Sequence, residues 1–310
     1  MLARVTAIAL NTYREAVRAR ILHGLFGLAL ATAGYALIVG AYASRSRMRV
    51  VSDIGAASIS IYAIIVAVVI GATSLYRELE LKTIFPILAR PIRRSEYLVG
   101  KLLGTVLTLA VFVAANAGVL LLALAALSGS SAAAVLAAAL GSAVVLGGVA
   151  WKLPRARTYL PVAWAFGVAL AGYFLAAGAP DDRRVVAGLA CLTLLEVTVI
   201  AALATLFSSF SSPFLTAVFT FSVVVVGRSA DSLAKLPTRV FGETIHDIGA
   251  FLSRIVPNLM LFVPPRPLLT GEASGADLSS YLLLAAAHAV GWAVLLVAVG
   301  SLVFQRRDFL

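Results

Sequence analysis

The sequence predicts an all-α polytopic membrane protein with about eight transmembrane helices. Of its 310 residues, 61% are hydrophobic and only 13% are charged, and the mean hydropathy is +1.01. A soluble domain is roughly half apolar and about a quarter charged, so much of this chain must face lipid. The apolar residues form long runs without the alternation of barrel strands, and helices satisfy their own backbone hydrogen bonds in lipid.

The net charge of +11 points to a membrane surface rather than to nucleic acid, because Lys and Arg are concentrated in short connections between apolar runs. Cys191 is the single cysteine, which excludes an intrachain disulfide and a cysteine-based metal site. We expect no cleavable signal peptide, since four arginines precede the first long apolar run and no small-residue cleavage motif follows. Membrane lipids are therefore an expected partner.

Residues 1–20 are predicted to form an amphipathic helix in the headgroup layer. Basic residues such as Arg4, Arg14 and Arg18 lie off an apolar stripe whose members are spaced by three or four residues, Leu2, Val5, Ala9, Tyr13 and Val17. A basic helix with such a stripe lies flat at a membrane surface. The alternative is a plain flanking anchor for the first span.

Eight runs reach or approach the length of about 20 apolar residues that a spanning helix needs. The fourth is rich in Ala and Gly, and the seventh is short enough to thin the bilayer locally. An alternative with six spans leaves out the fourth and fifth runs. The eight are Ile21–Ala43, Gly55–Leu75, Leu102–Leu127, Ala132–Trp151, Thr158–Gly178, Val185–Phe207, Pro213–Gly227 and Tyr281–Phe304.

The distribution of basic residues predicts that both termini are cytoplasmic. Arg4, Arg14, Arg18 and Arg20 place the amino terminus inside, and alternation then places the basic stretches 76–101 and 152–157 and the basic tail inside too. The stretch "SRSRMR" near Arg45 departs from this rule. Both the eight-span and the six-span arrangements keep the termini on one side of a cell membrane.

The outer segment, 228–280, is predicted to hold a membrane-parallel helix followed by an irregular apolar cap. The helix is indicated by a stripe at spacings of three and four, Phe241, Ile245, Ile248, Leu252 and Ile255. After it, a regular helix is excluded by four prolines, Pro257, Pro264, Pro265 and Pro267.

Few polar side chains fall inside the spans. Glu196 is central in the sixth run, and a carboxylate at mid-bilayer costs at least ~2.5 kcal/mol, so it must face protein or water. It is either a substrate or proton contact or a protonated group bonded to a neighbouring helix. His288, in the last span, has the same two interpretations. Asn116 and Thr198 are expected to make hydrogen bonds between helices.

The sequence contains no motif for ATP hydrolysis or metal catalysis. "YLVGKLLG" has a Gly-Lys pair but neither the preceding Gly nor the following hydroxyl of a phosphate-binding loop. Glu243 and His246 are three residues apart, and they fit the polar face of an interfacial helix better than a di-metal site. We therefore expect no catalytic residue and no metal bound by this chain.

The most informative stretch is Ser74–Gly104, "SLYRELELKTIFPILARPIRRSEYLVGKLLG". Acidic Glu78 and Glu80 come first, a short apolar run containing Phe85 follows, and a basic cluster precedes the third span. Anchoring on the cytoplasmic side needs only Arg or Lys. The additional acidic and apolar residues indicate a surface that docks a partner protein.

The same stretch resembles the membrane subunits of ABC-2 type transporters. That family has an acidic stretch after its second span, then an Arg-Pro, an Arg, a Glu-Tyr and a Gly-Lys that opens the third span. The matching residues here are Glu78, Arg90, Pro91, Arg94, Glu96, Tyr97, Gly100 and Lys101. Weaker similarities extend over most of the chain outside 131–184, namely "NTYREAVRARIL", "LFSSFSSP", "VPNLMLF" and "FQRRDF".

The resemblance implies a permease subunit of an exporter. It also implies that this subunit forms a homodimer or a heterodimer with a similar permease. It implies a cytoplasmic ABC ATPase as a separate partner, which binds the ATP and Mg²⁺. The loop before the third span would be the coupling helix. Its expected docking residues are Glu78, Glu80, Lys82, Phe85, Arg90, Pro91, Arg94, Glu96 and Tyr97.

The family usually has six spans, so the resemblance makes 132–178 an additional hairpin. The chain then divides into an amphipathic elbow helix at 1–20, spans 1–2 at 21–75, the coupling segment at 76–101, span 3 at 102–127, the hairpin at 132–178, spans 6–7 at 185–227, the outer segment at 228–280 and the last span with its tail at 281–310. Two other functions are alternatives to a permease subunit. One is a membrane-embedded enzyme that uses Glu196, His288 and Glu243/His246, and the other is a secondary transporter that moves protons through Glu196.

Overall fold

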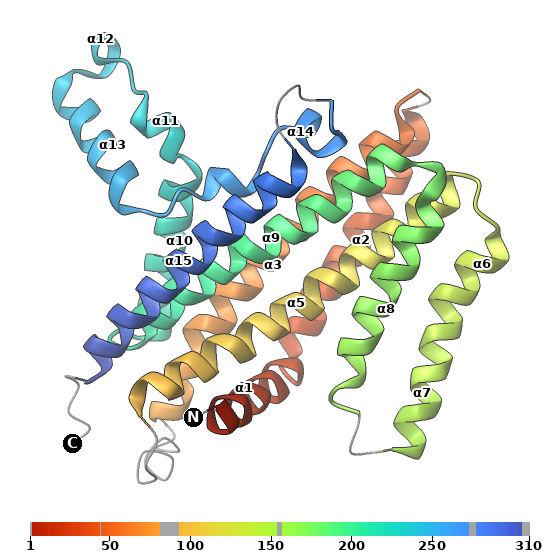
Figure 1. Cartoon of the computed structure of the whole chain (residues 1–310), viewed down its shortest axis with the longest axis horizontal. Helices are drawn as coiled ribbons and strands as arrows, with labels where there is room; N and C mark the ends of the chain where they lie inside the picture. Colours follow the sequence, from red (N-terminus) through yellow and green to blue (C-terminus); the bar gives the residue numbers. More distant parts are fainter. Residues whose placement is uncertain (1, 44, 81–92, 154–156, 273–276, 306–310) are drawn as a thin grey trace.

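The computed structural model describes residues 2–43, 45–80, 93–153, 157–272 and 277–305, apart from the side chains of 75–80, 240, 241 and 305. Over these ranges the chain is helical and contains no β-strand (Figure 1). Seven described helices are long and apolar enough to cross a membrane. The predicted all-α membrane fold is confirmed.

Three long helices form the centre of the bundle: α3 (Arg47–Glu80), α5 (Arg94–Leu127) and α9 (Pro180–Ser208). They pack on one another, and most of the fully buried aliphatic residues belong to them. Each extends beyond the predicted apolar run, because the polar residues at its ends continue the helix past the lipid-facing length. The ends of these helices therefore carry the polar contacts described below.

Four further helices lie against this centre. The amino-terminal α1 (Leu2–Val17) lies on α5, and α2 (Arg20–Tyr42) packs along α3. The short α10 (Pro213–Arg228) packs on α9 and α3, and α15 (Leu278–Gln305) packs on α9 and α5. The predicted seventh span is thus a shorter apolar helix of 16 residues.

The predicted additional hairpin is present at the edge of the bundle (Figure 1). Its first arm consists of α6 (Ala132–Leu136), the π-turn η1 (Ala137–Gly141) and α7 (Ser142–Lys152). Its second arm, α8 (Leu160–Leu175) followed by η3 (Ala176–Gly178), packs closely on α5. Both arms are helical over a spanning length, so the structure favours eight passes over six.

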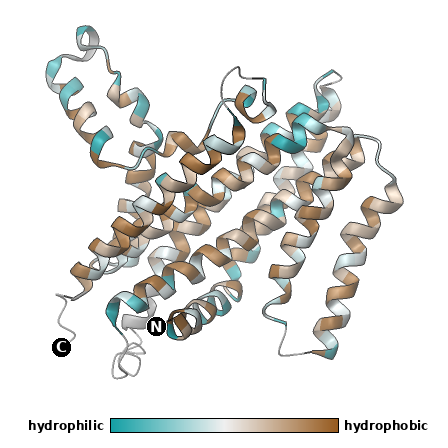
Figure 2. Ribbon diagram, viewed as in Figure 1, coloured by the Kyte–Doolittle hydropathy of each residue, from teal (hydrophilic) through white to brown (hydrophobic). Residues whose placement is uncertain are grey.

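The passes alternate in direction, so α1 and the carboxyl-terminal end of α15 lie at the same end of the bundle (Figure 1). We call it the α1 end. It also holds the end of α3, the start of α5 and the connection between α7 and α8. Figure 2 shows apolar residues along the bundle and hydrophilic ones gathered at the two ends. The predicted even number of passes is consistent with this arrangement, whereas the cytoplasmic position of the α1 end stays a prediction.

The opposite end carries short helices between α10 and α15. Three of them, α11 (Ala230–Ala234), α12 (Thr238–Phe241) and α13 (Glu243–Ile255), project beyond the bundle (Figure 1). The turn before α13 uses Gly242 at φ 80°, a conformation that glycine adopts without strain. Three members of the predicted stripe, Ile245, Ile248 and Ile255, are exposed on α13. The orientation of this helix to the membrane plane stays a prediction.

The proline-rich stretch after α13 is seated in the bundle. It contains the 3-10 turn η4 (Leu259–Phe262) and the short α14 (Arg266–Thr270). Leu259 and Phe262 are buried, and Tyr281 donates a hydrogen bond to the Leu261 carbonyl oxygen (2.5 Å). The predicted irregular cap is therefore fixed to α9, α10 and α15.

Candidate functional site

The candidate docking segment enters the described structure at Arg94, the first residue of α5. Glu78 and Glu80 belong to the last turns of α3, of which only the backbone is described. Four of the predicted docking residues lie outside the described residues: Lys82, Phe85, Arg90 and Pro91. The structure therefore bears on the base of the segment, where Arg94, Glu96 and Tyr97 join it to the bundle.

Tyr97 connects the start of α5 to the end of α15. Its ring is almost completely buried and stacks on Phe304, with centroids 6.4 Å apart and planes 12° apart. Arg94 donates from Nη1 to the Phe304 carbonyl oxygen (2.7 Å), and its guanidinium lies 5.8 Å from the same ring centroid. A guanidinium over an aromatic face is an attractive contact, so both residues fasten α15 to the docking segment.

Lys101, one turn further along α5, holds a buried charge. Its side chain is only 4% exposed, and its Nζ donates to the Ser74 hydroxyl of α3 (3.2 Å). The Glu15 carboxylate of α1 lies 4.0 Å from the same nitrogen. Because a buried ammonium requires such partners, Lys101 links α5 to α3 and α1 at one point.

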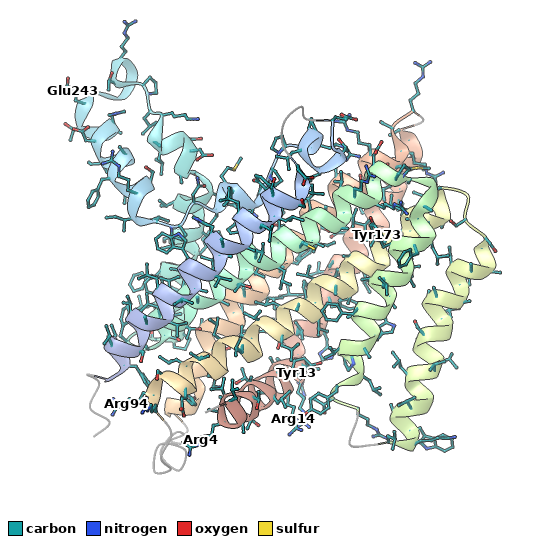
Figure 3. All side chains as sticks on the ribbon, viewed as in Figure 1. Arg4, Tyr13, Arg14, Arg94, Tyr173 and Glu243 are labelled. Atoms are coloured by element: carbon teal, nitrogen blue, oxygen red, sulfur yellow. The ribbon has the colours of Figure 1, made fainter. Side chains whose placement is uncertain are left out.

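Glu96 also faces α1. Its side chain is 7% exposed, and its Oε2 lies 4.0 Å from Nη1 of Arg4. Figure 3 shows Arg4 and Arg94 at the α1 end, on either side of this contact region. The acidic and basic residues of the predicted motif thus turn partly inward, where they contact other helices of the same chain.

Two glycines let α1 lie directly on α5. A Cβ on Gly100 would lie 2.7 Å from Cβ of Ile8, and one on Gly104 would lie 2.6 Å from Cβ of Thr12. Neither distance is sterically possible, so any larger residue would displace α1. Glycines four residues apart are a known device for close helix packing. This role was missed in the sequence, where the spacing within "GKLLG" is its signal.

The predicted apolar stripe of α1 covers α5. Val5, Tyr13 and Ala16 are buried, whereas Leu2 at the start of the stripe is exposed. Tyr13 stacks on Tyr159 (centroids 6.3 Å apart), the residue before α8. Burial, together with the nearby Tyr159, raises the pKa of the Tyr13 hydroxyl from 10.0 to about 12, so it stays neutral at physiological pH.

These contacts make the α1 end a rigid junction. The start of α5 is fastened to α15 by Tyr97, to α3 by Lys101 and to α1 by Gly100 and Gly104. Tightly packed interiors transmit displacement rather than absorbing it. A force applied just before Arg94 would therefore reach four helices together.

Glu196 has a partner that sequence reasoning missed. Arg228, the last residue of α10, donates Nε and Nη2 to its two carboxylate oxygens (2.8 and 2.9 Å). The same Nη2 donates to the Ser60 hydroxyl of α3 (2.7 Å). Bidentate contacts between a guanidinium and a carboxylate are among the stronger hydrogen bonds in proteins. The pair joins α3, α9 and α10 inside the bundle. Of the two interpretations of Glu196, a bond to a neighbouring helix therefore fits, but the partner on that helix is a cation.

The other polar residues of the spans differ in their contacts. Asn116 donates to the Phe112 carbonyl (2.8 Å), and Thr198 to the Leu194 carbonyl (2.7 Å), each one turn earlier in its own helix. For both side chains the preceding turn supplies a near acceptor. Hydrogen bonds from these residues to other helices stay a prediction. His288 contacts the rings of Phe262 and Trp292, and its buried Nε2 has no hydrogen-bond partner among the described residues.

The residues of the enzyme alternative have separate surroundings. His246 of α13 makes a hydrogen bond through Nδ1 to the Leu236 carbonyl oxygen (2.8 Å). Figure 3 shows Glu243 at the far end of the helices α11 to α13 that project beyond the bundle. Glu196 and His288 contact other groups, as described above. Among the described residues there is no group of three or more His, Cys, Asp or Glu that could hold a metal ion.

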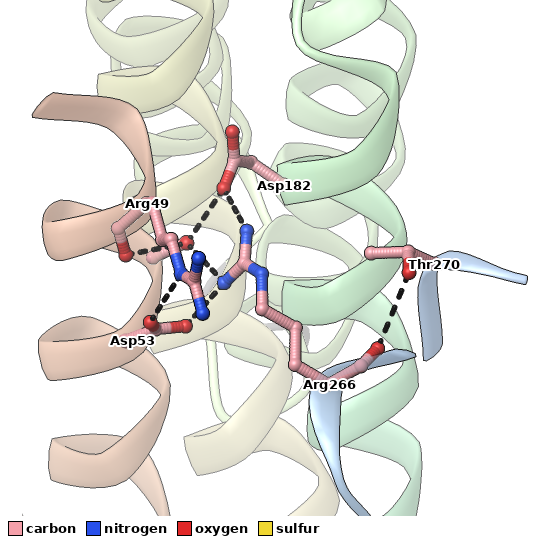
Figure 4. A network of polar contacts seen from close by, with 6 residues as sticks. Arg49, Asp53, Asp182, Arg266 and Thr270 are labelled. Atoms are coloured by element: carbon pink, nitrogen blue, oxygen red, sulfur yellow. Dashed lines mark hydrogen bonds and ion pairs between the residues drawn. The ribbon is translucent and has the colours of Figure 1, made fainter. Parts of the chain in front are cut away.

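A second polar cluster closes the opposite end of the bundle (Figure 4). Arg266 of α14 pairs with Asp53 of α3 and Asp182 of α9. Ser52 donates to Asp182 (2.8 Å) and accepts from Arg266 (3.2 Å), and Arg49 lies 3.7 Å from Asp53. This cluster could not be read from the sequence, because Arg266 is 214 residues from Ser52 and 84 residues from Asp182.

Comparison with known proteins identifies the family of the chain. A family model described as "ABC-2 family transporter protein" matches residues 5–309, which is nearly the whole chain. No curated protein matches at a significant level. Members of this family are normally non-catalytic permease subunits that work with an ABC ATPase. The matched range includes the additional hairpin as well as the junction at the α1 end, and the chain belongs to the ABC-2 family of transporter proteins.

Proposed function

We propose that this protein is the membrane subunit of an ABC exporter and that a separate ATPase drives it from the α1 end. The docking surface is the segment between α3 and α5 together with the start of α5. In this proposal the ATPase contacts residues such as Glu78, Arg90 and Arg94. The ATPase binds ATP and Mg²⁺, because this chain has no phosphate-binding loop.

The observation that carries the proposal is the junction around Tyr97 and Lys101. A docking segment can do mechanical work only where its base is rigid and is connected to the helices that must move. Here Tyr97 stacks on Phe304, and Lys101 contacts Ser74 and Glu15. α5 then runs unbroken for 34 residues, about 50 Å, to the opposite end.

The proposed cycle follows from this connection. Closure of the ATPase pair displaces the docking segment, and the junction passes the displacement to α1, α3, α5 and α15 as one unit. The opposite ends of α3 and α9 are held by Arg266, so the same movement strains that cluster. Two such subunits, identical or similar, form the translocation path. The transported substrate moves outward from the cytoplasm.

The experiment is co-expression with a candidate ATPase, followed by co-purification and measurement of ATP hydrolysis. Charge reversal at Glu78→Arg or Arg90→Glu is expected to abolish co-purification or to reduce coupled hydrolysis. Lys152→Glu is the matched control, since this exposed basic residue ends α7 at the α1 end and lies outside the docking segment. Equal recovery of the ATPase with all three variants would refute the proposed docking surface.

One further variant separates docking of the ATPase from transmission of its movement. Tyr97→Ala removes the stack on Phe304 but keeps the charged residues of the docking segment. We expect the ATPase to bind this variant, while stimulation of its activity by the permease falls. Loss of binding together with loss of stimulation would show that Tyr97 shapes the docking surface and does not only transmit movement.

A further inference from the structure

The hairpin leaves a cavity at the α1 end of the bundle. It has a volume of about 420 Å³ and lies between α7, α8, α5 and the first turns of α2. Sites for small ligands have volumes of about 300–1,000 Å³. The walls are apolar over most of their area, and the lining includes Phe26, Phe112, Leu146 and Trp164.

The cavity exists because the two arms of the hairpin are packed unequally. α8 lies directly on α5, where Gly118 and Gly172 bring the two backbones together. α7 has no buried residue, and Gly147 faces the cavity with no atom within 4 Å of the Cβ it lacks. In a membrane such a space is filled by whatever apolar group has access to it.

The mouth of the cavity is basic. His23 and Arg157 line it, and Arg157 donates from Nε to the Ala150 carbonyl (2.9 Å), which holds this side chain beside the end of α7. Three more cations are exposed on the same two connections, Arg18, Arg20 and Lys152. Neither 16–30 nor 143–164 contains an acidic residue. The adjacent Glu15 lies 4.0 Å from Lys101 of α5.

We propose that this cavity binds one acyl chain of an anionic phospholipid, whose phosphate lies against Arg157 and its basic neighbours. An acyl chain gains little by leaving other lipid tails, because both surroundings are apolar. Selectivity must then come from filling a space that no side chain occupies and from the charge of the headgroup. The site is independent of the proposed ATPase coupling.

The first test is native mass spectrometry of the full chain in a neutral detergent. The probes are phosphatidylglycerol and phosphatidylcholine with identical acyl chains, and glycerol 1-phosphate as the free headgroup. One phosphatidylglycerol is expected to remain bound with an affinity at least about fivefold above that of phosphatidylcholine, the factor that one basic residue supplies. Equal retention of the two lipids, or binding of glycerol 1-phosphate alone, would overturn the proposal.

Two adjacent glycines provide matched variants. Gly147 lines the cavity and Gly148 does not, and neither has an atom within 4 Å of an added Cβ. Gly147→Phe is expected to fill the cavity and remove phosphatidylglycerol, whereas Gly148→Phe should retain it. Arg157→Gln should reduce the preference for the anionic lipid about fivefold without changing phosphatidylcholine binding. Retention of phosphatidylglycerol by Gly147→Phe at the level of Gly148→Phe would refute the site.

A spectroscopic test needs no substitution in the cavity. Trp164 lines it, and the other two tryptophans, Trp151 and Trp292, can be replaced by Phe. Phosphatidylglycerol with brominated acyl chains should then quench Trp164 fluorescence at several-fold lower mole fraction than brominated phosphatidylcholine. Identical quenching by the two lipids, or dependence of quenching on protein self-association, would assign the cavity to bulk lipid or to a second copy.

Discussion

Glycines of α5 and of α7 show how differently one residue type is used in two parts of this molecule. In α5, Gly100, Gly104 and Gly118 each lie against another helix, with no room for a Cβ. In α7, Gly147 and Gly148 have nothing within 4 Å of that position. The most buried stretch of α5 is 72% buried within the chain, whereas the helical arm 132–152 is 0% buried.

The difference in burial between α5 and α7 comes from the helices that surround them and not from their composition. Both α5 and the helical arm 132–152 are rich in small and aliphatic residues and are long and apolar enough to cross a membrane. α5 is surrounded by α1, α3, α8, α9 and α15, so its glycines permit close approach. α7 contacts little besides α8 and η1, so its glycines leave space for lipid. Substitutions in the two regions should therefore have opposite consequences.

The largest effect is expected inside the packed centre, at the pair of Arg228 and Glu196. Arg228→Ala leaves the fully buried Glu196 without its cation, which should cost about 3–5 kcal/mol or force the carboxyl to take up a proton. Glu196→Gln should cost less, because Arg228 is about one-third exposed and can reach water. Unfolding in a denaturing detergent measures both. Equal costs would mean that Glu196 is not the more buried partner in the membrane.

The next effect concerns the seat of α1. Gly104→Val would push its side chain into Thr12, and overpacking of this kind costs about 1–3 kcal/mol. We also expect faster proteolysis within residues 2–17, because α1 would be displaced from α5. Gly24→Val serves as the control, since no atom lies within 4 Å of that Cβ position. Similar protease sensitivity of the two variants would contradict the proposed close packing.

The cluster at the opposite end should contribute less. Arg266→Ala removes contacts to Asp53 and Asp182, but Asp53 is about half exposed. The loss should be about 1–2 kcal/mol, and it should shrink as salt is added because the cluster is open to solvent. Unfolding midpoints at low and high salt provide the measurement. A loss that does not depend on salt would indicate that the cluster is sealed from water.

The smallest effect is expected in the hairpin and has the opposite sign. Gly148→Ala adds a methyl group to open space in a helix, which should stabilise α7 by about 0.5–1 kcal/mol. The same change at Gly118 of α5 should destabilise, because its Cβ would lie 2.7 Å from the Ala169 nitrogen. Measuring both variants by the same unfolding assay compares the two regions directly. Destabilisation by both would mean that α7 is covered by protein in the native assembly.

Most of the fold was predictable from the sequence, since spans in lipid depend on length and hydropathy. All eight predicted runs are helices with ends within about eight residues of expectation. The contacts between them were harder to predict. Phe304 as the partner of Tyr97, and Arg228 as the partner of Glu196, involve pairs far apart in the chain, and hydropathy does not encode pairing.

The sequence by itself determined that this is a helical membrane protein and where its apolar runs and its charged stretches lie. These properties follow from the free energy of transferring each segment into lipid, which is a local quantity. Only the tertiary structure decided which glycines lie against another helix and which face open space, and which buried charges have a partner of opposite sign. Those outcomes depend on the shape of the neighbouring helix, since a Cβ or a carboxylate is costly or harmless according to what stands opposite it.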